Sequence, residues 1–465
     1  MALANNSDLM AAIAVTRFGL GARPGEIDAA KSDPRGFLKA QIRADGAEQP
    51  QGDLKSSSDN LYVYAGLRKA RQAAKAEDAA DALKQVQQQI RGLVINEMAA
   101  RGRLAAQTPN GFAERWTLFW SNHFTVSALK GTAAPVVGSF EREAIRPHVF
   151  GRFEDMLLAS SRHPAMLLYL DQAQSAGPNS PAGQRRKSGL NENLGREILE
   201  LHTVGIAAGY SQADVTEFAR ALTGWSVSRG RDAPIGQGDS GPLGAFMYRP
   251  YLHEPGVRQV MGRTYAQAGE SQAGAVLHDL AGHPSTASHI AQKLARHFVA
   301  DTPPPSLVAK LQTSFVQSGG RLDHLAQTLI DAPEAWQPDA AKFKTPYEFL
   351  VSSWRASGQG PDPSAPLKFV GSLAVMGQRP FSPDSPKGWS DEAVDWASSD
   401  GVVKRLAWAE QAGAAMAAQG LEPSETGKAA LGARLTPAVA TAIARAETRP
   451  EAFAILLMSP EFQRR

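Results

Sequence analysis

The sequence predicts a mainly α-helical protein, one large multi-helix domain with long loops and a small β-hairpin. Apolar residues recur at helical spacing along most of the 465 residues. Helix start and stop signals flank these runs, and one stretch alternates apolar and polar residues as a strand does. With 43% apolar and 20% charged residues, the composition is that of a folded globular protein.

Residues 1–60 are predicted to form N-terminal helices and a linker. Leu9, Ile13 and Phe18 share one face of a helix over residues 8–18, and Pro34 opens a second helix. The GLGARPG segment between them lacks the preceding strand of a dinucleotide-binding loop, so it indicates a helix end followed by a turn. Residues 46–60 are polar and form the linker.

Residues 61–465 are predicted to form the main helical domain, a helical bundle. It opens with one long helical pattern over residues 61–106. The next helix, residues 110–125, gathers aromatic side chains on one broad face and should lie at the centre of the core. His123 closes this pattern. We expect a hydrogen-bonded core histidine there, with ligand binding as the alternative, and we expect the same for His297 further along the chain.

Residues 191–225 hold the densest run of carboxylates beside apolar positions, and they predict two helices joined by a glycine-marked turn. Leu194, Ile198 and Leu201 define the buried side of the first helix. The second helix begins with the capping box that starts at Ser211 and ends before Trp225.

The strand signal lies at residues 246–265, where apolar and polar residues alternate around the motif HEPG, and it predicts the β-hairpin. Residues 356–400 are rich in loops and include QRPFSPDSPKGW. Residues 401–465 are alanine-rich and are predicted to form the C-terminal helices.

Composition restricts the classes of function. The absence of cysteine excludes disulfides, thiolate metal sites and cysteine nucleophiles. Lys and Arg are dispersed and the net charge is only +3, which argues against nucleic-acid binding. No run approaches the roughly 20 apolar residues of a transmembrane segment. Residues 1–19 lack the basic start of a signal peptide, so we expect a cytoplasmic protein, with a periplasmic or envelope location as the alternative.

Several short motifs, in order along nearly the whole chain, resemble one known family. They are RFGLGA, W-x-NHF, NEN-x3-RE-x2-EL, ALTGW, an H-[DE]-x-G motif, GQ-x-PF-x-P-x3-PKGW and a closing SPEF. Together they resemble the bacterial domain-of-unknown-function 1800 family. The resemblance implies a mostly helical fold and no established reaction. Members are often exported and paired with a sulfatase-like protein. This chain departs from the family by having Glu254 where Asp is usual and by showing no leader.

The strongest candidate site lies on the first helix of residues 191–225. Asn193, Glu197 and Glu200 are spaced so that their side chains converge on one strip. If the hairpin brings His253 and Glu254 over this strip, Glu197, Glu200 and His253 could bind a divalent metal and form a catalytic set. The remaining binding candidates are Arg196, Arg258, His123 and Trp225.

Three interpretations of this strip are open. The glutamates could pair with Arg196, Arg220 or Arg258 and only fix helix packing. They could bind a ligand or partner, or they could catalyse a reaction. Because no catalytic motif is recognisable, the leading hypothesis is a non-enzymatic binding or assembly protein that acts with a sulfatase-like partner. The alternative is a metal-dependent hydrolase or transferase that uses the Glu/Glu/His set.

Overall fold

The computed structural model describes residues 2–73, 79–186, 189–230 and 241–465. Within these ranges the chain is mainly helical, with two small antiparallel sheets of two strands each. The predicted fold class is therefore confirmed. No helix in these ranges has both the length and the apolar character that crossing a bilayer requires.

The first half of the chain builds the centre of the molecule. Its helices are α1 (Ala2–Ile13), α2 (Glu26–Ala30), α3 (Pro34–Lys39), α4 (Ser57–Ala73), α5 (Ala79–Gln107), α6 (Gly111–His123), α7 (Val137–Phe140), α8 (Phe153–Arg162), α9 (Pro164–Tyr169), α10 (Pro181–Arg186), α11 (Asn193–Glu197) and α12 (Gln212–Leu222). Three π-helical segments, η1 (Ala14–Phe18), η3 (Glu141–Ile145) and η6 (Ile198–His202), continue α1, α7 and α11.

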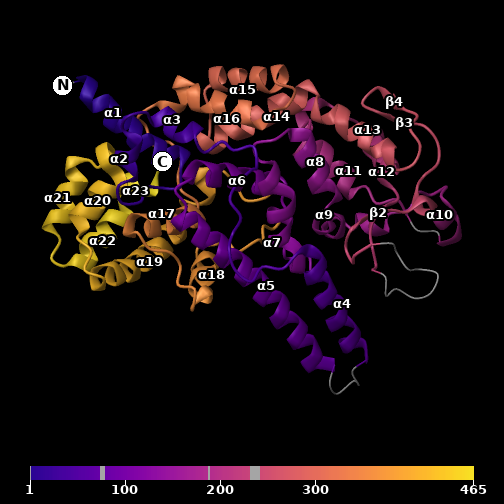
Figure 1. Cartoon of the computed structure of the whole chain (residues 1–465), viewed down its shortest axis with the longest axis horizontal. Coiled ribbons are helices and arrows are strands. Elements are labelled where there is room, and N and C mark those ends of the chain that lie inside the picture. Colours follow the sequence, from indigo (N-terminus) through magenta and orange to yellow (C-terminus); the bar gives the residue numbers. More distant parts are fainter. Residues whose placement is uncertain (1, 74–78, 187–188, 231–240) are drawn as a thin grey trace.

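The second half contains α13 (Glu270–Ala281), α14 (Pro284–Phe298), α15 (Pro305–Gln317), α16 (Leu322–Asp331), α17 (Pro346–Ser357), α18 (Pro366–Val375), α19 (Ser399–Ala418), α20 (Pro423–Leu431), α21 (Pro437–Arg445), α22 (Arg449–Met458) and α23 (Pro460–Gln463). In Figure 1, α14, α15 and α16 run along one side of the molecule. Helices α19 to α23 gather at the end where both termini lie.

Helix α6 lies at the centre of the core, as its aromatic face predicts. Phe112, Trp116 and Trp120 are fully buried. The Trp116 ring stacks on Phe150, with ring centroids 6.2 Å apart, and it also packs against Phe298 of α14. These rings belong to the large apolar cluster that runs from α1 to residue 336.

A second apolar cluster joins α5 to α17 and the C-terminal helices. Ile13, Phe18 and Leu38 of the predicted N-terminal segment lie in the first cluster together with α6 and α14. The domain boundary at residue 60 stays a prediction.

The helical pattern of residues 61–106 forms two helices rather than one. Helices α4 and α5 lie side by side and project from the body of the molecule (Figure 1). Residues 74–78, which connect them, lie outside the described ranges.

The small β-hairpin predicted within residues 246–265 is confirmed, and it lies at the end of this stretch rather than around HEPG. Strand β2 (Phe246–Tyr248) pairs with β1 (Trp225–Val227), and β3 (Arg258–Val260) pairs with β4 (Arg263–Tyr265). The HEPG motif therefore connects two sheets instead of forming a hairpin turn. The hairpin between β3 and β4 turns at Met261 and Gly262, which both have positive φ, as a tight two-residue turn requires.

The first helix of residues 191–225 contains a π-helical turn that the sequence pattern does not predict. Because η6 widens the helix, the residues that follow are rotated relative to an α-helical pattern. Leu194, Ile198 and Leu199 are buried, and His202 is buried one turn later. Leu201, predicted to be buried, is only partly so. The capping box at Ser211 is confirmed.

Candidate functional site

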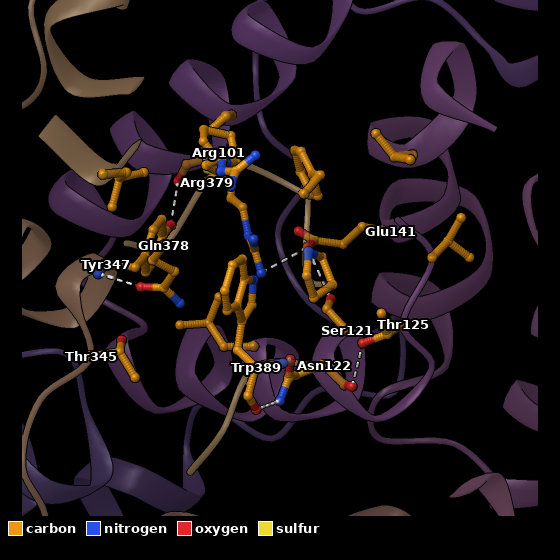
Figure 2. Close-up of a pocket in the computed structure, with 18 of the residues that line it drawn as sticks. Arg101, Ser121, Asn122, Thr125, Glu141, Thr345, Tyr347, Gln378, Arg379 and Trp389 are labelled. Carbon is orange, nitrogen blue, oxygen red and sulfur yellow. Dashed lines mark hydrogen bonds and ion pairs between the residues drawn. The ribbon is translucent and has the colours of Figure 1, made fainter. Parts of the chain in front are cut away.

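A pocket opens between α5, α6, α17 and residues 378–391, with a cavity volume of about 110 Å³. Figure 2 shows Tyr347, Gln378 and Trp389 on one side and Ser121, Thr125 and Glu141 on another. Segments more than 200 residues apart in the sequence therefore build one cavity. Its lining also includes His297 of α14 and Asp391.

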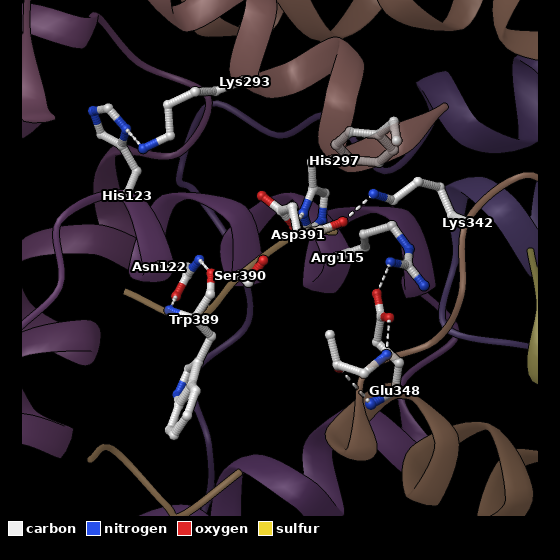
Figure 3. Close-up of polar contacts among 12 residues, drawn as sticks. Arg115, Asn122, His123, Lys293, His297, Lys342, Glu348, Trp389, Ser390 and Asp391 are labelled. Carbon is white, nitrogen blue, oxygen red and sulfur yellow. Dashed lines mark hydrogen bonds and ion pairs between the residues drawn. The ribbon is translucent and has the colours of Figure 1, made fainter. Parts of the chain in front are cut away.

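Asn122, near the end of α6, holds the wall formed by residues 378–391. Its side-chain Nδ2 donates to the carbonyl of Trp389 at 2.8 Å, and its Oδ1 accepts from the Trp389 N–H at 2.8 Å (Figure 3). One amide thus satisfies both backbone groups of Trp389. Ala128 N–H donates to the carbonyl of Phe381 at 2.7 Å and fixes the same wall at a second point.

A buried charge network lies behind the pocket. Arg101 pairs with Glu141 at 2.9 Å, and Arg146 links Glu141 to Glu114. Burial opposes the charge of Glu141, but Arg101 and Arg146 outweigh it and lower the pKa of the carboxyl. Arg379, which is exposed at the pocket, makes no side-chain hydrogen bond or ion pair with the described residues. It is therefore available to an anion.

His297 and Asp391 form a polar dyad in the lining of the pocket. The Nδ1 of His297 lies 2.7 Å from Oδ1 of Asp391, as Figure 3 shows. Burial, aided by Arg465 and Arg115, lowers the pKa of His297 although Asp391 raises it. Burial also opposes the charge of Asp391, yet His297 and Lys342 lower its pKa.

The contact of Nδ1 with the Asp391 carboxylate assigns the tautomer of His297. The ring is neutral, Nδ1–H donates to the carboxylate of Asp391, and Nε2 is left as an acceptor. Nε2 is buried and has no partner among the described residues. A buried acceptor without a partner costs roughly 1–3 kcal/mol. A ligand that donates to this nitrogen would recover that cost.

Glu348 anchors the pocket from α17. Its carboxylate pairs with Arg115 and, at 3.0 Å, with Arg465, and it completes a capping box with Thr345. Burial opposes its charge, but Arg465 and Arg115 hold the pKa of the carboxyl well below its usual range. Glu348 is thus an ionised, fully paired group that fixes the start of α17.

His123 lies in a second polar cluster, shown with Lys293 in Figure 3. Its Nε2–H donates to the carbonyl of His202 at 3.1 Å, and its Nδ1 accepts from Nζ of Lys293 at 3.0 Å. Burial and Lys293 hold the pKa of His123 well below its usual range. Burial lowers the pKa of Lys293 to about 8. His123 is therefore a neutral, hydrogen-bonded histidine in the core.

A family model described as a protein of unknown function (DUF1800) matches residues 13–464. The chain belongs to the DUF1800 family. No curated protein and no solved structure matches it.

Two of the DUF1800 motifs meet at the pocket. The W-x-NHF motif supplies Asn122, and the segment with PKGW supplies Gln378, Phe381 and Trp389. Gln378 accepts a hydrogen bond from the N–H of Tyr347 at 2.8 Å and so connects this segment to α17.

The predicted strip of Asn193, Glu197 and Glu200 contains one glutamate with a hydrogen-bond partner and one without in the DUF1800 protein. Glu200 accepts a hydrogen bond from Tyr210 at 3.2 Å, while Glu197 has neither a hydrogen bond nor an ion pair with the described residues. Burial, with Glu200 as the second cause, raises the pKa of Glu197 to about 7 against the effect of Arg196. Asn193 is exposed.

The arginines expected to close this strip pair elsewhere. Arg196 pairs with Glu192 at 3.1 Å, and Arg220 and Arg258 both pair with Glu217. Glu197 and Glu200 are therefore not neutralised by these arginines.

His253 and Glu254 bind backbone groups and side chains around Thr223 and Asn179. Nδ1 of His253 lies 2.9 Å from the carbonyl of Thr223. Glu254 is buried, and its two oxygens accept from Asn179 at 2.8 and 2.6 Å. Trp225 is fully buried beneath the guanidinium of Arg162.

Among the described residues, no three His, Asp or Glu side chains form a group that could hold a metal ion. The structure thus does not gather Glu197, Glu200 and His253 as a metal centre. The catalytic and binding roles assigned to the candidates from sequence stay predictions.

Sequence reasoning missed the His297–Asp391 dyad. The two residues are 94 positions apart, and Asp391 lies in a loop without periodicity. The available signal was the motif GQ-x-PF-x-P-x3-PKGW, which ends two residues before Asp391.

Proposed function

We propose that this DUF1800 protein is a binding protein that holds a small ligand in the pocket between α6, α17 and residues 378–391. The observation that carries the proposal is His297, which lines the cavity and whose buried Nε2 has no partner among the described residues and is left as an acceptor by the contact with Asp391. Most buried polar atoms in folded proteins have a hydrogen-bond partner, so a buried atom without one calls for an explanation, of which ligand binding is one.

The lining groups indicate the ligand's chemistry. His297 requires a hydrogen-bond donor such as a hydroxyl, whereas Arg379 offers an unpaired positive charge at the pocket. Tyr347, Phe381 and Trp389 add aromatic surface. A small hydroxylated carboxylate satisfies all three features. Glu141 and Glu348 are already paired with arginines, which supports binding by a preformed site.

A matched pair of probes tests the proposal. We expect 4-hydroxybenzoate to bind about fivefold more tightly than benzoate, because one hydrogen bond to a buried acceptor is worth about 1 kcal/mol. Isothermal titration calorimetry on the full chain measures both affinities.

Two variants separate the two contacts. Arg379→Gln should weaken both probes, and Arg445→Gln, an exposed arginine of α21, is the matched control that should change neither. Asp391→Asn should reduce the preference for the hydroxylated probe, since an asparagine that donates to Nδ1 turns Nε2 into a donor, and the phenol must then accept through its weakly basic oxygen. Equal affinities for the two probes in the unmodified protein, or no binding of either, would reject the proposal.

The sulfatase-like partner is a separate proposal that rests on the family resemblance alone. Its test is affinity purification of the full chain from its host at native levels. Recovery of a sulfatase-like protein in stoichiometric amount is the expected result, and recovery of the chain alone would contradict it.

A further inference from the structure

A second and larger cavity lies on the other side of α17. It is bounded by the end of α5, α17, α18 and α19, helices that lie close together in Figure 1, and by residues 359–363. Its volume of about 830 Å³ exceeds that of the first pocket and falls in the range of binding sites for extended small ligands. We call it the Trp354–Trp408 groove, after the two indole side chains that line it.

The N–H groups of both indoles of the groove have no hydrogen-bond acceptor among the described residues. The side chains of Trp354 and Trp408 are partly exposed, and neither indole N–H makes a hydrogen bond with the described residues. In contrast, the indoles of Trp116, Trp336 and Trp396 donate to backbone carbonyls at 2.7, 2.6 and 2.9 Å. The Trp354–Trp408 groove therefore presents two donors that the fold does not use.

Contacts beneath the groove hold the two rings in place. Trp354 packs edge-to-face on Phe369, with centroids 4.8 Å apart, and Trp408 packs on Phe349 at 5.3 Å. Such ring pairs fix the orientation of each indole. The ring surfaces are thus preformed for a flat apolar face of a ligand.

The polar lining of the groove is mostly neutral. Four exposed glutamines, none of whose side chains hydrogen-bonds to the described residues, surround the indoles: Gln107, Gln359, Gln411 and Gln419. Each amide offers donors and an acceptor. The charged residues of the lining are Lys368 and Asp362, which balance each other.

We propose that the Trp354–Trp408 groove binds a neutral oligosaccharide. A pyranose ring has an apolar C–H face that packs on an indole and a rim of hydroxyls that both donate and accept, which matches the amides and the open indole N–H groups. A proline-rich peptide offers carbonyl acceptors but few donors, so it would leave the amide oxygens unmatched. A phosphate-bearing or acidic polymer would need more positive charge than Lys368 supplies.

Three hexasaccharides and one peptide form the probe set: cellohexaose, laminarihexaose, chitohexaose and decaproline. Calorimetry and tryptophan fluorescence of the full chain measure binding. We expect at least one hexasaccharide to bind and to change the fluorescence, because Trp354 and Trp408 would lose contact with water.

Variants locate the site. Trp408→Ala should weaken binding by about tenfold or more, as removal of a central aromatic contact does in other interfaces. Since Trp408 also packs on Phe349, the double variant Gln411→Ala/Gln419→Ala, at an exposed residue of α19 and at the residue that follows this helix, tests the same site without touching the core. It should weaken binding several-fold, whereas Gln317→Ala on α15, another exposed glutamine, should not.

The alternative outcomes overturn the proposal. They are no binding by any hexasaccharide, binding that the α19 double variant leaves unchanged, or binding of decaproline alone. The Asp391→Asn variant of the first pocket should bind the hexasaccharide normally. Failure at one site is thereby distinguished from failure at the other.

Discussion

At the scale of single residues, Glu197 and Glu192 show how two glutamates five positions apart acquire opposite properties. Glu192 accepts hydrogen bonds from Thr216, Gln212 and Arg196, and the Thr216 bond is the largest cause that lowers its pKa. Glu197 lacks such donors among the described residues, and burial raises its pKa to about 7. The direction of each shift therefore follows from the local donors rather than from the residue type.

This contrast predicts a pH-dependent stability. The native state holds the Glu197 proton up to about pH 7, whereas the unfolded chain releases it near pH 4.5. Folding thus becomes less favourable as the pH rises through this window. Glu197→Gln should raise the free energy of unfolding at pH 8 by about 1 kcal/mol, a value reduced for solvent screening, and change it little at pH 4. Urea unfolding at both pH values measures this.

Glu192→Gln is the matched control. Because the pKa of Glu192 is lowered, its charge stabilises the fold above the unfolded value, and neutralising it should destabilise the protein at pH 8. Destabilisation by Glu197→Gln at pH 8 would contradict the assigned shift.

At the scale of elements, the start of α12 has two structural roles. Ser211 and Asp214 form a capping box, in which Oγ of Ser211 accepts from the Asp214 N–H and Oδ2 of Asp214 accepts from the Ser211 N–H at 2.7 Å. The second oxygen, Oδ1 of Asp214, accepts from the N–H of Met261 at 2.6 Å. The cap of α12 therefore also holds the turn between β3 and β4.

Replacing Ser211 and replacing Asp214 should lower the free energy of unfolding by different amounts. Ser211→Ala should lower the free energy of unfolding by about 1 kcal/mol, as the loss of an N-cap does. Asp214→Ala should cost about 2 kcal/mol, since it also leaves the Met261 N–H without a partner. Hydrogen exchange at Met261 should accelerate in Asp214→Ala alone, and equal exchange in the two variants would contradict this double role.

At the scale of the whole molecule, Arg355 connects α17 to residues 21–26 and to the end of α5. It is buried, and its guanidinium donates to the carbonyls of Gly21, Ala105 and Thr108 and to Glu26 at 2.7–2.9 Å. Three segments far apart in the sequence thus depend on one side chain.

Replacement of Arg355 should destabilise the protein as one unit. Arg355→Met leaves Glu26 and three carbonyls without their donor, so we expect a loss of about 3–5 kcal/mol in a single urea transition. Lys428→Met, which breaks an exposed pair with Glu425, should cost less than about 1 kcal/mol. Two separated transitions in Arg355→Met would show that the two apolar clusters unfold independently.

Features that depend on neighbouring residues in the sequence could be predicted, whereas contacts between segments distant in the sequence could not. Local patterns predict the helical class, the central place of α6 and the cap at Ser211, because periodicity and capping act within one element. The pairing of β1 with β2 and the meeting of His297 with Asp391 depend on segments brought together by the whole fold. No local pattern encodes such contacts, so the pairing of β2 with β1 was not predicted and the pocket was missed.

The π-helical turns η1, η3 and η6 each carry a buried polar side chain, respectively Arg17, Glu141 and His202. A π-turn is what an α-helix becomes when it accommodates one inserted residue without shifting the register on either side. Single-residue gaps between relatives are therefore expected at these three places.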